Sequence, residues 1–315
     1  MGNKSKNIKK KKSSVKKSEI DFSQMPISDV FNILAGSNRN KQKEKEGSWM
    51  VESVGDHQWM FVEPRELREV YDDFDYGCIL LEEGEVTKAE KLLRKVVRKA
   101  PLHIDALHHL AIIQDVKGET EEARKLWTKG VEAGRSALTK KIKPGDLFEW
   151  GWIENRPYLR CLDGLATRTL QDGDTAQAMS MFEELLSFNP NDNQGVREDL
   201  VEIYLEQNEL KKAVELCRKY KDDILVGVSY GYPLTLFKLG KREQASKMIK
   251  KVIKKSPKIA KELFKKSHKK PKSEMPGYLA VGSWDEAYIY WQRYGKFWDA
   301  EALEWLRTEA NKNPK

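Results

Sequence analysis

Apolar and polar positions follow a helical period from Pro64 to about residue 270, in successive pairs of amphipathic segments. The second segment of each pair carries an alanine that is followed four residues later by a larger side chain. Successive alanines are 34, 55, 35 and 32 residues apart, which describes a repeat of about 34 residues with one insertion of about twenty. These alanines are Ala89, Ala123, Ala178, Ala213 and Ala245.

This repeat predicts helical hairpins that stack side by side. A small residue lets the two helices of one hairpin approach closely, and larger residues fill the seam between them. One hairpin cannot bury its apolar face alone, so neighbours must stack. Alanine-rich hairpins occur in other α-helical proteins too, but near-equal intervals with matching neighbours favour a repeat. We predict an all-α, tetratricopeptide-repeat (TPR)-like, right-handed superhelical solenoid of about five helical hairpins.

The fourth and fifth copies of the repeat are less regular than the others. Arg197 and Ser229 stand where a bulky apolar residue is usual in the TPR pattern. Pro233 lies inside the predicted first helix of the fifth copy, and a proline there removes one helical hydrogen bond. We therefore expect a kink or a late start in that helix.

Four tryptophans close the chain at intervals of seven, at Trp284, Trp291, Trp298 and Trp305. Gly295 interrupts the series, and glycine commonly ends a helix. Two short helices, at about 284–294 and 297–307, are therefore favoured over one rod. A solenoid needs a terminal unit over its last exposed seam, so we predict a C-terminal capping hairpin. A coiled coil and an exposed aromatic ligand platform are the alternatives.

The composition divides the chain into six regions. Residues 1–20 are rich in lysine and serine, with too few apolar side chains to offset the entropy of ordering, so we predict a disordered basic tail. A Gly55-Asp56 turn between alternating apolar residues allows a β-hairpin. The predicted regions are the tail (1–20), a linker with short elements (21–63), repeats 1–2 (64–135), an aromatic insertion (136–157), repeats 3–5 with a lysine-rich band (158–270) and the tryptophan-rich capping hairpin (271–315).

The insertion carries Phe148, Trp150 and Trp152 with little helical periodicity. These aromatic residues could contact a ligand from an otherwise regular array. They could also fill the gap between the helices that the insertion separates, which is the interpretation that we favour.

Charge is distributed unevenly along the chain. The formal net charge is +8, but residues 1–19 carry +7 and residues 247–272 carry +11, which leaves −10 on the remainder. Lysine-rich stretches attract nucleic acid and other polyanions without reading sequence. Residues 1–19 and 247–272 are therefore the candidate surface for RNA, DNA, an acidic protein or an anionic membrane surface. The alternative for 247–272 is that the lysines form an ordinary solvated helix face.

The compartment is predicted from what the sequence lacks. No apolar run approaches the ~20 residues that span a bilayer, so we expect no integral membrane segment. The lysine-rich start has no apolar core like that of a secretory signal. Three widely separated cysteines do not suggest a disulfide framework. We expect a reducing, cytoplasmic location.

Catalytic and cofactor motifs are not recognisable in the sequence. His108 and His109 are adjacent, so on a helix they face about 100° apart and cannot share a metal ion from one face. Neither HExxH nor CxxC occurs, and neither do the glycine-rich motifs that bind phosphates. We predict a protein that is not an enzyme, with no catalytic residue, no cofactor and no metal.

The first helices of the repeats should line the inner groove of the solenoid. Phe74 and His108 at these positions exclude the Lys/Arg/Asn set with which some TPR domains hold a terminal carboxylate. An acidic middle and an apolar end are expected further along. The candidate partner-binding residues are Phe74, His108, Asp163, Glu198, Glu202, Tyr230 and Phe237.

Three stretches carry a more specific resemblance. They read ENRPYLRCLDGLA, NPNDNQGVREDLVEIYLEQNELKKAVELCRKYKDD and WDEAYIYWQRYGKFWDAEALEWL, and lie within residues 154–306. This half of the chain resembles soluble bacterial TPR proteins and, more distantly, the suppressor-of-tumorigenicity-seven family. The resemblance implies an interaction module and supplies no catalytic residue. We therefore predict a scaffold that binds a protein or peptide along its groove, with a nucleic-acid- or ribosome-associated accessory factor as the alternative.

Overall fold

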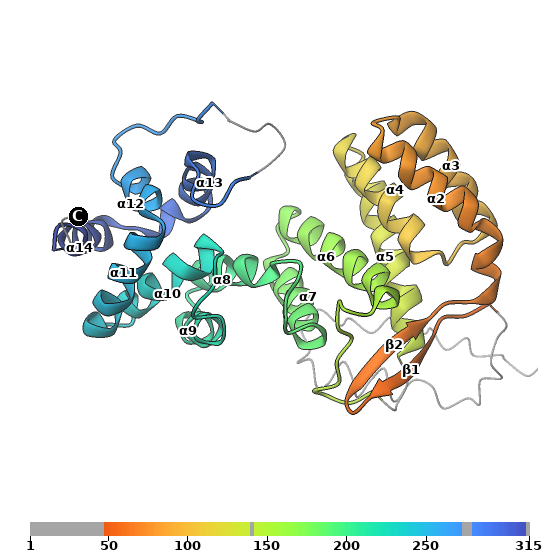
Figure 1. The fold of residues 1–315 in the computed structure, drawn as a ribbon, viewed down its shortest axis with the longest axis horizontal. Helices are drawn as coiled ribbons and strands as arrows, with labels where there is room; N and C mark the ends of the chain where they lie inside the picture. The colour runs from red at the N-terminus through yellow and green to blue at the C-terminus, as the bar shows by residue number, and fades with distance from the viewer. Residues whose placement is uncertain (1–46, 139–141, 273–278, 313–315) are drawn as a thin grey trace, which may run out of the picture.

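The computed structural model describes residues 47–138, 142–272 and 279–312 and forms a curved array of helical hairpins (Figure 1). The prediction of an all-α, TPR-like solenoid is confirmed. The predicted basic tail and the rest of residues 1–46 lie outside the described residues. Five hairpins follow one another: α2 (Tyr71–Glu82) with α3 (Val86–Lys99), α4 (Ile104–Val116) with α5 (Thr120–Ala137), α6 (Arg156–Gln171) with α7 (Thr175–Phe188), α8 (Val196–Glu206) with α9 (Leu210–Lys219), and α10 (Val226–Lys238) with α11 (Arg242–Lys255).

Each hairpin turns at the same position of the repeat, five residues before the repeat alanine. Gly84, Gly118, Gly173 and Gly240 have φ between 74° and 93° there, a left-handed conformation that glycine adopts without steric penalty. In the fourth hairpin Asn208 takes this position with φ 57°, consistent with the tolerance of asparagine for it. All five repeat alanines are completely buried, because the paired helices cross there.

A β-hairpin precedes the helices and packs beneath α5 (Figure 1). Strands β1 (Met50–Gly55) and β2 (Gln58–Val62) pair antiparallel, and the 3-10 helix η2 (Arg65–Val70) leads into α2. Asn155, which is fully buried, ties this hairpin to the repeats. Its side chain accepts a hydrogen bond from Phe61 N at 3.0 Å and donates to Trp59 O at 3.1 Å. An isolated two-stranded hairpin is marginal in water, so these tertiary contacts hold it in place.

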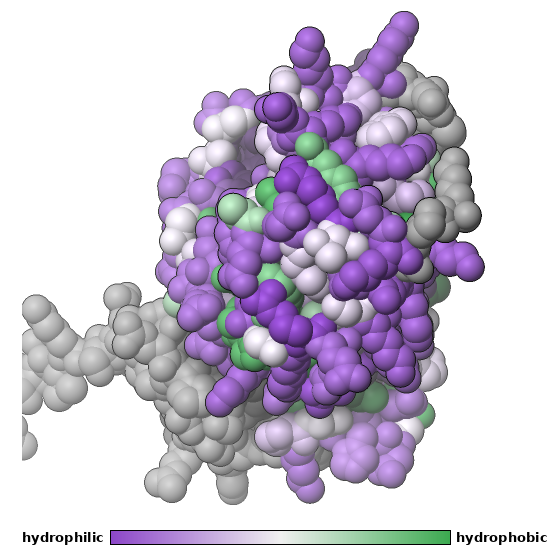
Figure 2. Space-filling model, turned by 90° about the vertical axis from the view of Figure 1, so that its left-hand side faces the viewer, coloured by the Kyte–Doolittle hydropathy of each residue, from purple (hydrophilic) through white to green (hydrophobic). Residues whose placement is uncertain are grey.

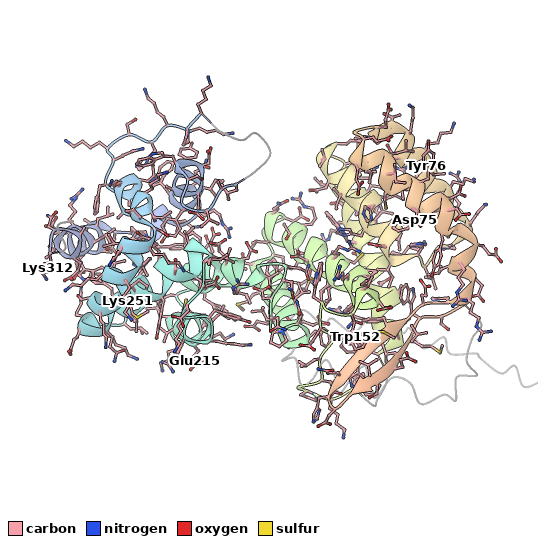
Figure 3. The ribbon with its side chains drawn as sticks, in the orientation of Figure 1. Asp75, Tyr76, Trp152, Glu215, Lys251 and Lys312 are labelled. Carbon is pink, nitrogen blue, oxygen red and sulfur yellow. The ribbon has the colours of Figure 1, made fainter. Side chains whose placement is uncertain are left out.

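The insertion between the second and third hairpins buries one aromatic side chain, Phe148, and leaves another, Trp152, partly exposed. Phe148 is completely buried between Phe61 and Phe188, with ring centroids 5.1 Å from each. Trp152 is 38% exposed and lies near the β-hairpin (Figure 3). The short 3-10 helix η3 (Ile153–Asn155) then leads into α6.

The proline inside the fifth hairpin does not delay its first helix. Helix α10 begins at Val226 and continues through Pro233 to Lys238. Pro233 is the eighth residue of this helix, so the helix is already established before the missing N–H. Pro233 itself is buried, and packing of this helix on both neighbours offsets the lost hydrogen bond.

The chain closes with a short helix, α12 (Pro257–Leu263), and two capping helices, α13 (Trp284–Tyr294) and α14 (Ala300–Asn311). Between the capping helices, η4 (Gly295–Phe297) turns the chain where Gly295 predicted a break. The second capping helix starts later than the predicted residue 297. Asp299 is its N-cap and accepts a hydrogen bond from Ala302 N at 2.9 Å, and this cap sets the start of the helix.

Three of the four terminal tryptophans contact the hydrophobic core that the last two repeats share with the capping helices, but to different extents. Trp298 is 4% exposed and donates from Nε1 to the Tyr290 hydroxyl at 2.9 Å. Trp305 is half-buried and stacks on Phe237, with centroids 4.5 Å apart. Trp291 is also half-buried against this core, whereas Trp284 is exposed. The heptad spacing therefore reflects two separate capping helices rather than a coiled coil.

Candidate functional site

The first helix of each hairpin forms the inner face of the array. Five predicted contact residues occupy the same repeat position, fifteen residues before the repeat alanine. The structure divides them into two groups: three border open hollows, and two contact the capping helices. They are Phe74, His108 and Asp163 in the first group and Glu198 and Tyr230 in the second.

The larger hollow is a groove of about 450 Å³ between α4, α6 and the start of α8. It combines apolar and aromatic walls with several polar groups. We call it the α4–α6 groove. Its lining is His108, Ile112, Asp115, Trp127, Trp150, Arg160, Asp163, Gly164, Thr167, Arg168, Gln171, Asn193 and Gln194.

Trp127 forms the floor of this groove together with His108. The indole Nε1 of Trp127 donates to His108 Nδ1 at 3.2 Å, so the ring proton of the neutral histidine is on Nε2. Burial lowers the pKa of His108 to about 3, so this side chain is uncharged at neutral pH. Gly164 makes the arrangement possible, because a Cβ at this position would lie 2.4 Å from the indole.

Asp163 is the acidic group of the groove. Gln194 Nε2 donates to Asp163 Oδ2 at 2.9 Å. Burial, together with the nearby charges of Asp199 and Asp192, raises the pKa of the Asp163 carboxyl to about 7. Among the residues that the structure describes, Asp163 forms no ion pair.

The arginines of the groove are already paired. Arg160 Nη2 lies 2.8 Å from Asp105 Oδ2. Arg168 contacts Asp115 at 3.1 Å and Asp172 at 2.8 Å. These pairs neutralise both guanidinium groups, so the groove does not present a free cation to a ligand.

A second, smaller hollow of about 280 Å³ lies next to α2. Phe74 borders it and packs on His103, with ring centroids 4.5 Å apart. His103 caps α4 by accepting a hydrogen bond from Ala106 N at 3.2 Å, and burial lowers its pKa. The hollow therefore combines aromatic and apolar side chains with three acidic residues, Glu63, Asp75 and Asp105.

Glu198 and Glu202, the predicted acidic middle of the groove, do not face an open surface. Arg293 of α13 inserts between them: its Nε lies 2.7 Å from Glu202 Oε2 and its Nη1 lies 3.7 Å from Glu198 Oε2. Asp199 completes this cluster at 2.7 Å from Arg293 Nη2. The sequence gives no sign of this contact, because its partners lie more than 90 residues apart.

Tyr230 and Phe237, the predicted apolar end of the groove, are not available to a partner in this structure. Tyr230 is fully buried against Tyr290 and Trp298, and its hydroxyl donates to Ser256 O at 2.8 Å. Phe237 is 3% exposed and lies beneath Trp305. The prediction of an apolar contact surface here is wrong, because the capping helices fold back over it.

Comparison with protein families gives a match over most of the chain. The family model described as "Transcriptional repressor TCF25" matches residues 85–315. This range includes α3 to α14, so that of the repeats only the first helix, α2, lies outside it. The chain belongs to the Tcf25 family. The name differs from the subgroup that the sequence resembles, and it is compatible with a TPR-like fold.

Solved structures of other repeat proteins are similar to this Tcf25-family chain at low identity. One is a tetratricopeptide repeat protein from Parabacteroides merdae ATCC 43184, with 15% identity, a TM-score of 0.48, and 79% of this chain and 81% of that chain covered. Another is YrrB, a TPR protein with an unusual peptide-binding site, with 17% identity, a TM-score of 0.45, and 60% and 87% covered. No curated protein sequence matches the chain.

The lysine-rich band of this Tcf25-family protein lies at the opposite end of the array from the Phe74 hollow. Figure 3 shows Lys251 on α11 and Lys312 after α14 far from Asp75 and Tyr76 on α2. The surface at this end is mainly hydrophilic (Figure 2). Within the part of the chain that the structure describes, only Lys250 and Lys265 of the twelve lysines in 247–272 form ion pairs. Most of the positive charge here is therefore not neutralised.

Across residues 47–138, 142–272 and 279–312, no group of three or more His, Cys, Asp or Glu side chains is arranged to hold a metal ion. Over the same ranges, no helix combines the length and apolar character needed to cross a bilayer.

Proposed function

We propose that the protein is a non-enzymatic scaffold that binds a protein segment along the inner face of its first three repeats. The observation that carries this proposal is the difference between the two halves of that face. The α4–α6 groove is open, has aromatic and apolar walls, and includes a 42% exposed Ile112. Its volume of about 450 Å³ is within the usual range of ligand sites, of about 300–1,000 Å³.

The description of the Tcf25 family as a transcriptional repressor indicates a biological process in which this scaffold could act. We propose that the bound segment belongs to a protein that takes part in transcriptional repression. Such a role requires access to the nucleus, whereas the sequence alone favours the cytoplasm. Imaging of the fluorescently tagged full chain distinguishes the two, because exclusion from the nucleus would contradict the repression role and leave the scaffold role standing.

Affinity capture with a groove variant and a matched control tests the scaffold proposal. Ile112→Arg places a long charged side chain in the α4–α6 groove, and Ile224→Arg makes the same change at another exposed isoleucine outside it. We expect mass spectrometry to show reproducible partners with the wild-type chain and the Ile224 variant, and their loss with the Ile112 variant. Equal recovery with both variants would place the binding site elsewhere.

The unpaired lysines of α11, α12 and the following segment support a second candidate function, binding to RNA or another polyanion. Such binding neutralises phosphates and releases counterions, so it weakens steeply with added salt. Fluorescence anisotropy with a labelled single-stranded RNA, from 20 to 200 mM salt, tests it. Absence of binding at the lowest salt concentration would exclude this function.

A further inference from the structure

We infer that the α4–α6 groove selects a protein segment by a lysine or arginine side chain, with Asp163 as the group that binds its positive charge. This inference rests on the proposed scaffold function and deepens it, because it names the chemistry of the partner. Three independent features of the structure support it: the charges within the groove, its walls, and a contact elsewhere in the same chain.

The charge balance of the groove favours a cationic ligand. Arg160 and Arg168 are held by Asp105, Asp115 and Asp172, and His108 is neutral. Asp163 is the acidic lining residue without an ion-pair partner among the described residues, and Gln194 supplies only a neutral hydrogen bond. A ligand carboxylate or phosphate would be repelled by Asp163, and no unpaired basic side chain in the groove lining would offset this repulsion. A lysine or arginine would complete the charge of this partly buried carboxyl.

The walls of the groove suit the rest of such a side chain. Trp127, Trp150 and Ile112 provide apolar and aromatic surface next to Asp163. Lysine and arginine carry an apolar stem that packs on surfaces of this kind while the charged end reaches a polar group. Indole rings also attract cations, and Arg156 already lies over Trp150, 5.3 Å from the ring centroid.

The chain itself shows a basic side chain bound at the equivalent position. Glu198 stands in the fourth repeat where Asp163 stands in the third, fifteen residues before the repeat alanine. In the fourth repeat the site is occupied by Arg293, which contacts Glu198, Asp199 and Glu202. The repeat geometry thus already holds a guanidinium group against an inner-face carboxylate. In the third repeat, the carboxylate is present and the described chain supplies no such guanidinium.

A positional-scanning library of fluorescein-labelled decapeptides tests this inference on the full chain. Each position is fixed in turn as lysine, arginine, glutamate or the uncharged norleucine, and binding is measured by anisotropy. We expect one position to require lysine or arginine. Asp163→Asn keeps the shape of the side chain and removes its charge, so it should weaken the best basic peptide at least tenfold and leave its norleucine counterpart unchanged.

Control measurements separate the inference from the proposed function. Asp222→Asn removes the charge of an exposed aspartate outside the groove and should bind the basic peptide like the wild type. A thermal melt verifies that Asp163→Asn is folded. If Ile112→Arg abolishes peptide binding, the peptides bind in the groove and the scaffold proposal stands. The inference is overturned if these peptides show no preference for a basic residue, or if Asp163→Asn does not weaken their binding. Absence of groove-dependent binding across the library overturns both.

Discussion

The inner faces of the first three and the last two repeats share one sequence register but have different environments. His108 and Asp163 border an open groove, whereas Tyr230 at the same repeat position is completely buried. The difference arises from α13 and α14, which fold back onto α8, α10 and α11 (Figure 1). Identical repeat positions can therefore serve as a contact surface in one half and as core in the other.

This comparison also separates two kinds of charged residue. In the closed half, Glu198, Asp199 and Glu202 share Arg293, and Lys296 adds a contact to Glu206 at 3.0 Å. In the open half, the arginines of the groove have ion-pair partners within the repeats, whereas Asp163 accepts a neutral hydrogen bond from Gln194 and has no ion-pair partner among the described residues. The acidic residues that the sequence placed in one continuous groove are thus divided between a structural role and a candidate binding role.

The largest effect is expected from opening the closed half at its core. Trp298→Ala removes a buried indole and should lower the free energy of unfolding by about 3–5 kcal/mol. Solenoid stability is roughly a sum of local and neighbour terms, so hydrogen exchange should rise first over residues 226–312. Trp291→Ala is the control, because Trp291 is only half-buried and stacks on His268. A wild-type melting temperature for Trp298→Ala would contradict its role in the cap.

A smaller effect is expected from removing the charge that joins α13 to α8. Arg293→Met removes the shared counterion of Glu198, Asp199 and Glu202, of which Glu202 keeps a contact to Lys296 at 3.7 Å, and should destabilise the fold by about 1–3 kcal/mol at pH 8. Burial already raises the pKa of Glu198 and of Asp199, and loss of Arg293 raises both further. The protonated acids need no counterion, so the deficit should shrink as the pH falls to 5.

Urea unfolding at pH 5 and pH 8 measures this difference between the two forms. Arg307→Met is the matched control, since Arg307 is 49% exposed and its one ion pair among the described residues is with Glu304 at 3.6 Å; its guanidinium also lies 5.3 Å from the centroid of the Phe264 ring. Surface pairs of this kind contribute about 0–1 kcal/mol. An Arg293 deficit that is the same at both pH values would show that the side chain stabilises the cap by packing rather than by charge.

Binding in the open half should depend on pH through Asp163. A carboxyl with a pKa of about 7 is mostly protonated at pH 6 and mostly ionised at pH 8, so the affinity for a lysine peptide should rise about tenfold over this range. The negative charges of Asp192, in the loop before α8, and of Asp199, on α8, act on this carboxyl, while His108 on α4 stays neutral. The lysine of the peptide remains charged throughout.

Anisotropy titrations at pH 6, 7 and 8 check this dependence, with Asp163→Asn expected to give a flat profile. The same raised pKa predicts that the free energy of unfolding of the wild type falls as the pH rises from about 4 to about 7, because the folded state binds the proton more tightly. A wild-type affinity that does not change with pH would show that Asp163 does not bind the positive charge.

The smallest effect is expected at the lysine-rich end. Lys251 is exposed on α11, so Lys251→Gln should change the free energy of unfolding by less than about 0.5 kcal/mol. If this surface binds RNA, a plot of log affinity against log salt concentration should be less steep for Lys251→Gln than for the wild type, by about one unit of slope. A loss of stability larger than about 1 kcal/mol would show that this lysine belongs to the closed half's packing.

The sequence by itself determined the repeat and its register. The spacing of the alanines located the hairpins, and the structure then showed a glycine or asparagine at the turn, five residues before each alanine. Gly295 indicated where the capping helices divide, although the later start at Asp299 depends on a specific cap. These features were readable because they depend on contacts within one repeat or between neighbouring repeats, which recur at a fixed interval along the chain.

Only the tertiary structure decided which inner positions remain open. Whether Arg293 reaches Glu202, 91 residues away, depends on the curvature of the whole array and on the direction in which the capping helices return. Asn155 likewise joins the β-hairpin to the repeats across 94 residues. No local period encodes such contacts, because they are made once rather than in every repeat. For this reason the sequence could place Tyr230 and Phe237 on the inner face. It could not show that the capping helices bury them there.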